Sequence, residues 1–109
     1  MTQQNKIGKV ATTISTRTND NGTQETTVRY HATDVFNLIK DTRTGDATLT
    51  LKTGGWFTAT TKTRINQACA VFGVPLRVFQ ERGYWFVRYD NANVKPFKDG
   101  VAFAVEVSL

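Results

Sequence analysis

Residues 54–73, GGWFTATTKTRINQACAVFG, decide the fold class because they contain the one helix that the sequence predicts. Four apolar side chains recur at a spacing of three and four residues, which is typical of one buried helix face. These side chains are Ile65, Ala68, Cys69 and Phe72. Gly73 is a typical stop after such a helix. We therefore expect a helix over residues 61–72, with Thr60 or Thr61 as its N-cap.

The segments on both sides of this helix alternate between apolar and polar residues, which is the pattern of half-buried strands. The alternation is clearest at residues 47–53, and residues 76–80 and 84–90 flank a Glu-Arg-Gly turn as a β-hairpin. Further strands are expected over residues 7–15, over residues 25–41 as one bent strand or two short ones, and over residues 101–109. The sequence therefore predicts an α+β domain, a mostly antiparallel β-sheet of about six or seven strands with one α-helix packed on it.

The length and composition are those of one globular domain. The chain has 109 residues, of which 39% are hydrophobic and two are proline, so it can bury a core without disulfides or metal. We expect residues 1–6 to be disordered and residues 7–109 to form the single domain. The one cysteine cannot form an intramolecular disulfide, and no apolar run resembles a signal peptide or a membrane span. We therefore expect a cytoplasmic protein with no membrane partner.

The positive charge is concentrated in the central third of the chain. The formal net charge is +5, and residues 52–88 hold six basic side chains and one acidic side chain, while the other two thirds nearly balance. Such an asymmetry is expected when one face of a protein meets a polyanion. A solvated basic face without a partner would give the same distribution.

The predicted helix begins with basic rather than acidic side chains. Lys62 and Arg64 would lie in its first turn, where the helix dipole disfavours cations by roughly 0.3–1 kcal/mol each. A bound anion would offset this cost, because backbone N–H groups, the dipole and both cations would converge on it. The hydroxyls of Thr58, Thr60 and Thr61 could add donors. The alternative is that the threonines cap the helix and the basic side chains reach solvent.

Aromatic residues are interleaved with the basic third of the chain. Alternation in the predicted hairpin places Tyr84, Phe86 and Arg88 on one face and Trp85, Val87 and Tyr89 on the other. One of these faces must pack on the helix. The other face, if open, would combine aromatic rings with Arg88 and Arg77, the pattern that binds single-stranded nucleic acid. A purely structural role for these rings stays open, since aromatic side chains in strands are more commonly core residues.

The sequence does not favour catalysis. His31 is the only histidine, which excludes most metal sites, and Cys69 lies on the apolar stripe of the predicted helix. The acidic residues are scattered through turns, with no paired arrangement for general acid-base work. No GxxxxGK[ST] phosphate-binding loop is present. We therefore expect no enzymatic activity, no cofactor and no metal.

A resemblance to a known family rests on two strings, GGWFTATTKTRINQACAVFGVPLRVFQERGYWFV at residues 54–87 and PFKDGVAF at residues 96–103. With their pattern GGW-x-T-x-TTK-x-R-x-NQ followed by an aromatic hairpin, they resemble a family of small, uncharacterised proteins encoded by tailed phages and prophages. The resemblance covers roughly Tyr30 to Phe103. It implies a phage origin and a location in the cytoplasm of the bacterial host, and it implies no established activity.

These observations predict a small phage accessory protein that binds nucleic acid through phosphate contacts and aromatic stacking, with single-stranded DNA, double-stranded DNA and RNA all open as ligands. The alternatives are a protein-binding inhibitor of a host enzyme or anti-phage defence complex, and a component of the virion or its assembly. An exposed sheet face or edge would serve the inhibitor, and it could also form a homodimer. The expected nucleic-acid-binding residues are Trp56, Thr58, Thr60, Thr61, Lys62, Arg64, Arg77, Arg82, Trp85 and Arg88.

Overall fold

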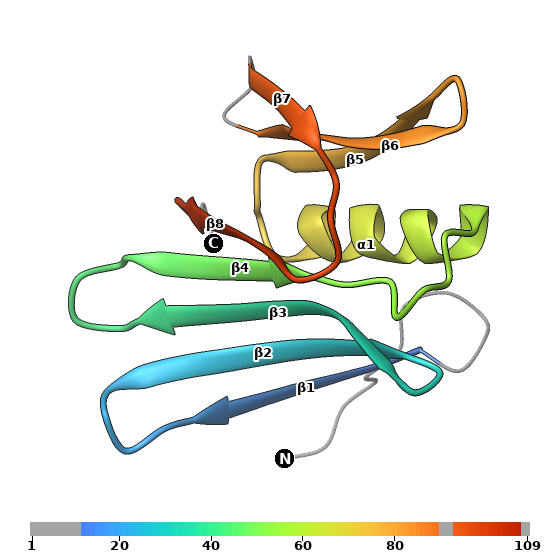
Figure 1. Ribbon diagram of the computed structural model, residues 1–109. Helices are drawn as coiled ribbons and strands as arrows, with labels where there is room; N and C mark the ends of the chain where they lie inside the picture. The colour runs from blue at the N-terminus through green and yellow to red at the C-terminus, as the bar shows by residue number, and fades with distance from the viewer. Residues whose placement is uncertain (1–11, 90–92, 108–109) are drawn as a thin grey trace.

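The computed structural model describes residues 12–89 and 93–107, and these residues form eight strands and one helix (Figure 1). In chain order the elements are β1 (Thr12–Thr18), β2 (Thr23–Tyr30), β3 (Thr33–Asp41), β4 (Ala47–Leu51), α1 (Ala59–Val71), β5 (Leu76–Glu81), β6 (Tyr84–Tyr89), β7 (Asn93–Pro96) and β8 (Val101–Val105). All the strand pairs are antiparallel, and the predicted α+β class is confirmed. The strand that the sequence did not predict is β7, which is short and ends in a proline.

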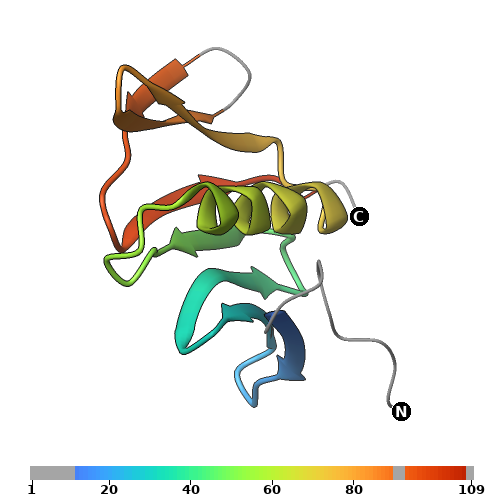
Figure 2. The same cartoon turned by 90° about the vertical axis from the view of Figure 1, so that its right-hand side faces the viewer.

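The strands divide between two sheets. The larger sheet has the order β1-β2-β3-β4-β8, and the smaller sheet has the order β5-β6-β7. The helix α1 contacts β2 and β3 of the larger sheet and β5 of the smaller one. Figure 2 shows the smaller sheet above the helix, joined to β8 by the segment that follows β7. One helix thus contacts both sheets, and each sheet keeps one face that carries exposed side chains.

Residues 25–41 contribute to two strands rather than to one bent strand. The turn between β2 and β3 begins at His31, which adopts a positive φ of 55°. A β-bulge follows in β3, because Val28 pairs with Phe36 and the register then shifts, so that Val35 is an extra residue. Val35 and Phe36 are both fully buried. The bulge therefore explains two consecutive core residues that strict alternation would not place on one face.

The remaining strands correspond to the predicted ones with shifted ends. The segments predicted at 47–53, 76–80 and 84–90 form β4, β5 and β6. The strand expected at 7–15 is β1, and its predicted first part lies outside the described residues, as does the N-terminal segment expected to be disordered. The strand expected at 101–109 is β8, which ends at Val105.

The hydrophobic core joins the two sheets and the helix. Its fully buried apolar side chains come from the larger sheet (Val28, Val35, Phe36, Leu49 and Leu51), from α1 (Ile65 and Ala68) and from the smaller sheet (Val87). Cys69 belongs to the same core, and burial raises the pKa of its thiol to about 12. The predicted helix stripe is therefore the buried face of α1, with Phe72 half-buried just beyond its end.

The helix begins two residues earlier than the sequence predicts. Its N-cap is Thr58, whose backbone is extended and whose hydroxyl accepts a hydrogen bond from the Thr61 N–H at 3.2 Å. The expected N-cap at Thr60 or Thr61 is wrong, because Thr61 is buried inside the first turn. Arg64 consequently lies beyond the first turn, where the helix dipole has little effect on a cation.

Candidate nucleic-acid interface

The smaller sheet has one buried face and one exposed face. The register places Val78 opposite Val87 and Gln80 opposite Trp85 on the buried face. Trp85 is only 8% exposed, and both valines are less exposed still. Trp85 therefore packs largely as a core side chain, and the more exposed aromatic residues of β5 and β6 lie on the other face.

The exposed face combines arginines with aromatic rings. We define the arginine-aromatic face as Arg77, Phe79, Tyr84, Phe86 and Arg88. Across the β5-β6 pair, Arg77 lies opposite Arg88 and Phe79 lies opposite Phe86. Tyr84 lies at the end of the face opposite Glu81 and is 71% exposed. One end of this face is thus cationic and its middle is aromatic, while its other end holds Tyr84 beside the exposed carboxylate of Glu81.

Ring stacking organises the centre of the arginine-aromatic face. The rings of Phe79 and Phe86 have centroids 5.7 Å apart and planes inclined at 26°. The guanidinium of Arg88 lies over the Phe79 ring, with its central carbon 5.4 Å from the ring centroid. Both rings are half-buried, whereas both arginines are exposed. The face therefore presents partly exposed flat rings directly beside two cations.

The ion pairs among the described residues all lie in the first half of the chain. They are Arg17 with Glu25 at 3.0 Å, Arg29 with Asp34 at 2.8 Å, and Arg43 with Asp41 at 3.1 Å. Within the described part of the chain, Arg77 and Arg88 form no ion pair. Like charges directly opposite each other on a sheet repel. An anion bound between these two arginines would relieve that repulsion.

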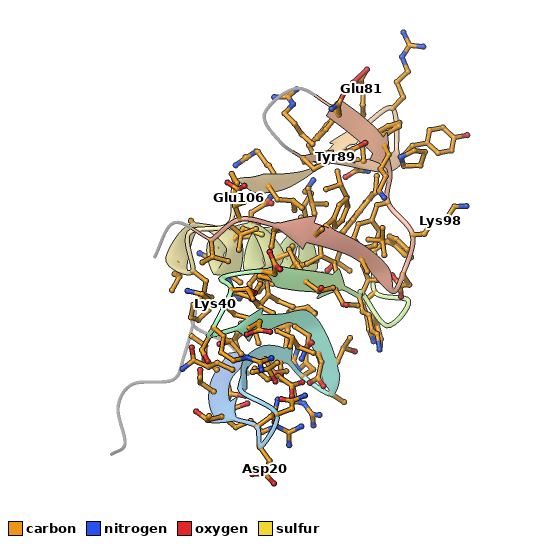
Figure 3. The ribbon with its side chains drawn as sticks, turned by 90° about the vertical axis from the view of Figure 1, so that its left-hand side faces the viewer. Asp20, Lys40, Glu81, Tyr89, Lys98 and Glu106 are labelled. Carbon is orange, nitrogen blue, oxygen red and sulfur yellow. The ribbon has the colours of Figure 1, made fainter. Side chains whose placement is uncertain are left out.

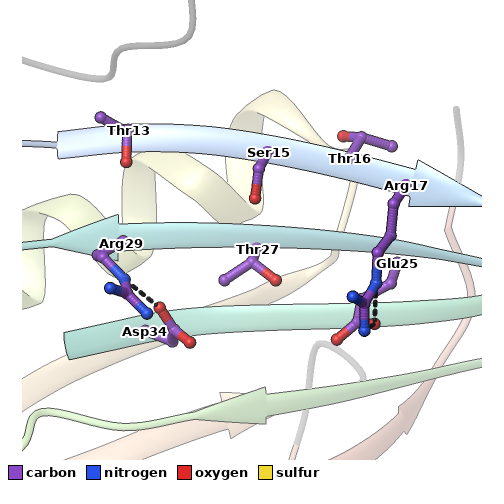
Figure 4. Close-up of a pocket in the computed structure, with 8 residues that line it drawn as sticks. All are labelled: Thr13, Ser15, Thr16, Arg17, Glu25, Thr27, Arg29 and Asp34. Carbon is purple, nitrogen blue, oxygen red and sulfur yellow. Dashed lines mark hydrogen bonds and ion pairs between the residues drawn. The ribbon is translucent and has the colours of Figure 1, made fainter. Parts of the chain in front are cut away.

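A depression on the exposed face of the larger sheet has a different charge balance (Figure 4). It has a volume of about 360 Å³ and is lined by hydroxyl side chains and by two of these ion pairs. Glu25 accepts hydrogen bonds from Asn37 at 2.7 Å and from Arg17, and both hold the pKa of its carboxyl below the usual value. The arginines here are already neutralised by carboxylates, so this surface is a weaker candidate for binding a polyanion.

A further depression lies between the two sheets. It has a volume of about 750 Å³, and its lining includes Tyr89 of β6 and Glu106 after β8, both labelled in Figure 3. Asp46 also lines it. Two carboxylates would repel phosphate groups, so the arginine-aromatic face remains the better candidate site.

Comparison with known proteins identifies the family. A family model described as Kyanoviridae Gp96 protein matches residues 1–104. The chain belongs to the Kyanoviridae Gp96 family. This membership confirms the resemblance to a small phage protein family, and the chain is therefore phage-encoded. No curated protein and no solved structure matches the chain. Within the described residues, no helix has the length and apolar character needed to cross a membrane.

In this Kyanoviridae Gp96 family member, the glycine pair forms a loop that exposes two aromatic side chains. Both glycines have positive φ, 66° and 89°. The Asp99 carboxylate accepts hydrogen bonds from the Thr53 N–H at 3.0 Å, from its hydroxyl at 2.7 Å, and from the Gly55 N–H at 3.3 Å. The loop leads into Trp56, which is 66% exposed, and Phe57, which is 52% exposed.

The start of α1 does not bring the expected anion ligands together. The hydroxyl of Thr58 caps the helix, and Thr61 is buried. Arg64 is 9% exposed, and its guanidinium donates to the Thr12 hydroxyl at 3.2 Å and to the Gln67 side-chain oxygen at 3.1 Å. Arg64 is thus engaged inside the protein, contrary to the expectation that it faces a ligand.

Three other expected site residues lie nearer the surface. Lys62 donates from Nζ to the Gln80 side-chain oxygen at 3.3 Å and lies 5.8 Å from the centroid of the Trp85 ring. Arg82 is exposed in the β5-β6 turn with a positive φ of 53°, and Thr60 is exposed in the first turn of α1. Lys62 and Arg82 flank the smaller sheet and could extend a basic surface around it.

Sequence reasoning omitted three rings of the arginine-aromatic face from the site. The sequence places Tyr84 and Phe86 on the same face as Arg88 and predicts stacking there if that face is open, yet the expected binding residues include no ring besides Trp56 and Trp85. Phe79 was not placed on that face. The available signal was the two-residue spacing of Phe79 from Arg77, which puts both on one face of β5.

Proposed function

We propose that this phage-encoded protein acts in the infected host by binding nucleic acid on the arginine-aromatic face. The observation that carries the proposal is the pair of exposed arginines, Arg77 and Arg88, which lie opposite each other without an ion pair among the described residues. They stand directly beside the stacked rings of Phe79 and Phe86.

Each part of this face suits one part of a nucleic acid. Arginine guanidinium groups bind phosphate through paired N–H donors. Aromatic rings on a sheet stack with bases, which contributes about 1–3 kcal/mol per base. Lys62 and Arg82 would add phosphate contacts at the margins, and Trp56 would add a further exposed ring. Arg64 has no part in this face because its side chain is buried, and Trp85 lies on the opposite face of the smaller sheet.

Retention of short oligonucleotides by the purified protein tests the proposal. We expect the protein to retain DNA or RNA oligonucleotides at low ionic strength, and the Arg88→Gln variant to bind several-fold more weakly because one phosphate contact is lost. Arg29→Gln is the matched control, since Arg29 is exposed on the larger sheet and already paired with Asp34. A wild-type protein that retained no single- or double-stranded oligonucleotide would refute the proposed function.

A further inference from the structure

An aromatic hollow lies at the end of the arginine-aromatic face. It has a volume of about 490 Å³, within the range of small-molecule sites, and its lining includes Phe57, Gln80, Tyr84, Trp85, Phe86 and Phe97. Tyr84 and Phe86 belong both to this lining and to the arginine-aromatic face. The hollow is therefore continuous with the surface proposed to bind nucleic acid.

Three rings form a preorganised part of the hollow. Phe57 meets Trp85 edge to face, with centroids 5.1 Å apart and planes at 83°. Phe97 is the third ring of the group. Its centroid lies 5.6 Å from that of Trp85 and 6.1 Å from that of Phe57. The Phe97 N–H donates to the Trp85 carbonyl at 3.0 Å, which fixes the position of the chain after β7. Phe57 remains half exposed, so one wall of the group faces solvent.

The polar groups near the hollow suit a flat ring attached to a phosphate. Gln80 contributes a carboxamide, and its Nε2 has no partner among the described residues and can donate to a carbonyl or ring nitrogen. Lys62 holds its Nζ 3.3 Å from the Gln80 oxygen and offers a cation nearby. None of the described residues that line the hollow carries a carboxylate. Its chemistry thus matches an uncharged aromatic heterocycle with an anionic group beside it.

We propose that the hollow receives one unstacked nucleobase of a single strand lying across the arginine-aromatic face. This inference rests on the proposed function and makes it more specific. A base in a duplex is stacked and paired inside the helix, so it could enter the hollow only after costly extrusion. A single strand can turn one base away from its neighbours at little cost and stack it on protein rings. Single-stranded nucleic acid is therefore the preferred ligand.

A fluorescent oligonucleotide tests this assignment. The probe is a single-stranded thymidine oligonucleotide with one 2-aminopurine, a base whose fluorescence falls when it stacks, compared with the same strand paired to its complement. We expect tighter binding of the single strand and quenching of the 2-aminopurine. Phe57→Ala should weaken binding of the single strand by about tenfold and reduce the quenching, because one stacking wall is lost. Gln80→Ala should weaken binding less, and it changes no core residue.

Val71→Ala is the matched control, because Val71 is an exposed apolar residue on α1 that does not line the hollow. Circular dichroism would verify that each variant is folded. If Arg88→Gln weakens binding but Phe57→Ala and Gln80→Ala leave it unchanged, the hollow does not bind a base. The proposed function of the arginine-aromatic face would then still stand. Tighter binding of the duplex than of the single strand would also overturn it. Absence of binding to either form, and to the same sequences made as RNA, would refute both proposals.

Discussion

A single carboxylate, that of Asp99, organises the loop that exposes the aromatic side chains after β4. It accepts from two donors of Thr53 and from the Gly55 N–H. Within this loop Gly54 is in close contact with β3, since a Cβ added at Gly54 would overlap the Thr33 hydroxyl. Gly55 also has a positive φ, but a Cβ there would meet nothing within 4 Å.

These two glycines therefore allow backbone strain to be separated from steric overlap. We expect Gly55→Ala to lower the free energy of unfolding by about 1 kcal/mol, because alanine is strained at positive φ. Gly54→Ala should lower it by a further 1–3 kcal/mol or so, because the new methyl group must displace Thr33. Urea denaturation of both variants measures the difference. Equal losses of stability would contradict the predicted contact.

Arg64 shows where sequence reasoning about single residues fails. Arg64 is not one of the four apolar side chains of the predicted stripe, and a charged residue beside that stripe would ordinarily reach solvent. It is nevertheless buried on the same face of α1 as Ile65 and Ala68. The structure instead places β1 within reach, so that Thr12 accepts a hydrogen bond from the guanidinium. Thr12 and Arg64 are 52 residues apart in sequence, and no local pattern predicts such a contact. Lys62, two residues earlier, is only half-buried, and its Nζ donates to the exposed side chain of Gln80.

Between elements, one asparagine side chain connects α1 to the edge of β5. Asn66 donates from Nδ2 to the Val78 carbonyl and accepts from the Val78 N–H, both at 2.8 Å. Among the described strands, β5 lies at the edge of the smaller sheet, so these backbone groups have no neighbouring described strand to bind. Asn66 thus makes the two backbone hydrogen bonds that a neighbouring strand would otherwise make to Val78, and this protects the edge of the sheet from pairing with another chain.

Replacing Asn66 with alanine measures how much its hydrogen bonds to β5 stabilise the protein, and a second alanine variant on the same helix accounts for helix propensity. We expect Asn66→Ala to lower the free energy of unfolding by about 1–3 kcal/mol, because the Val78 N–H and carbonyl lose their partners. Thr63→Ala, at an exposed position of the same helix, should change stability by less than about 0.5 kcal/mol. Thermal unfolding of the two variants provides the test. If the two variants were equally stable, the Asn66 side chain would contribute nothing to stability beyond its helix propensity.

The elements that the sequence predicts well are those whose pattern is local. Alternation identified β4, β5 and β6, and it sorted the side chains of β6 correctly between two faces. The open face could not be identified until the helix was placed against the other one. β7 was missed because it is four residues long and its pattern is weak. The N-cap was misplaced because Thr58, Thr60 and Thr61 are chemically equivalent, and only the extended backbone at Thr58 distinguishes it.

At the scale of the whole molecule, the charge asymmetry of the sequence has a structural counterpart. The arginines of β1, β2 and the β3-β4 turn are neutralised by ion pairs, whereas those of β5 and β6 form none among the described residues. The sequence located this excess in the central third of the chain. It could not separate the buried Arg64 from the exposed Arg77 and Arg88, because burial depends on how the two sheets enclose α1.

This difference between the two sheets predicts how binding responds to salt. For a single strand, the logarithm of the binding constant falls with the logarithm of salt concentration by about 0.7 for each phosphate neutralised. The double variant Arg77→Gln and Arg88→Gln should therefore have a slope shallower by about 1.4, because two phosphate contacts are lost. Arg17→Gln with Arg29→Gln removes the same charge from the larger sheet, where both arginines are ion-paired, and should leave the slope unchanged. Fluorescence anisotropy titrations over a range of salt concentrations measure both slopes. If the two double variants flattened the slope equally, binding would depend on net charge alone. This result would refute the arginine-aromatic face as the binding site.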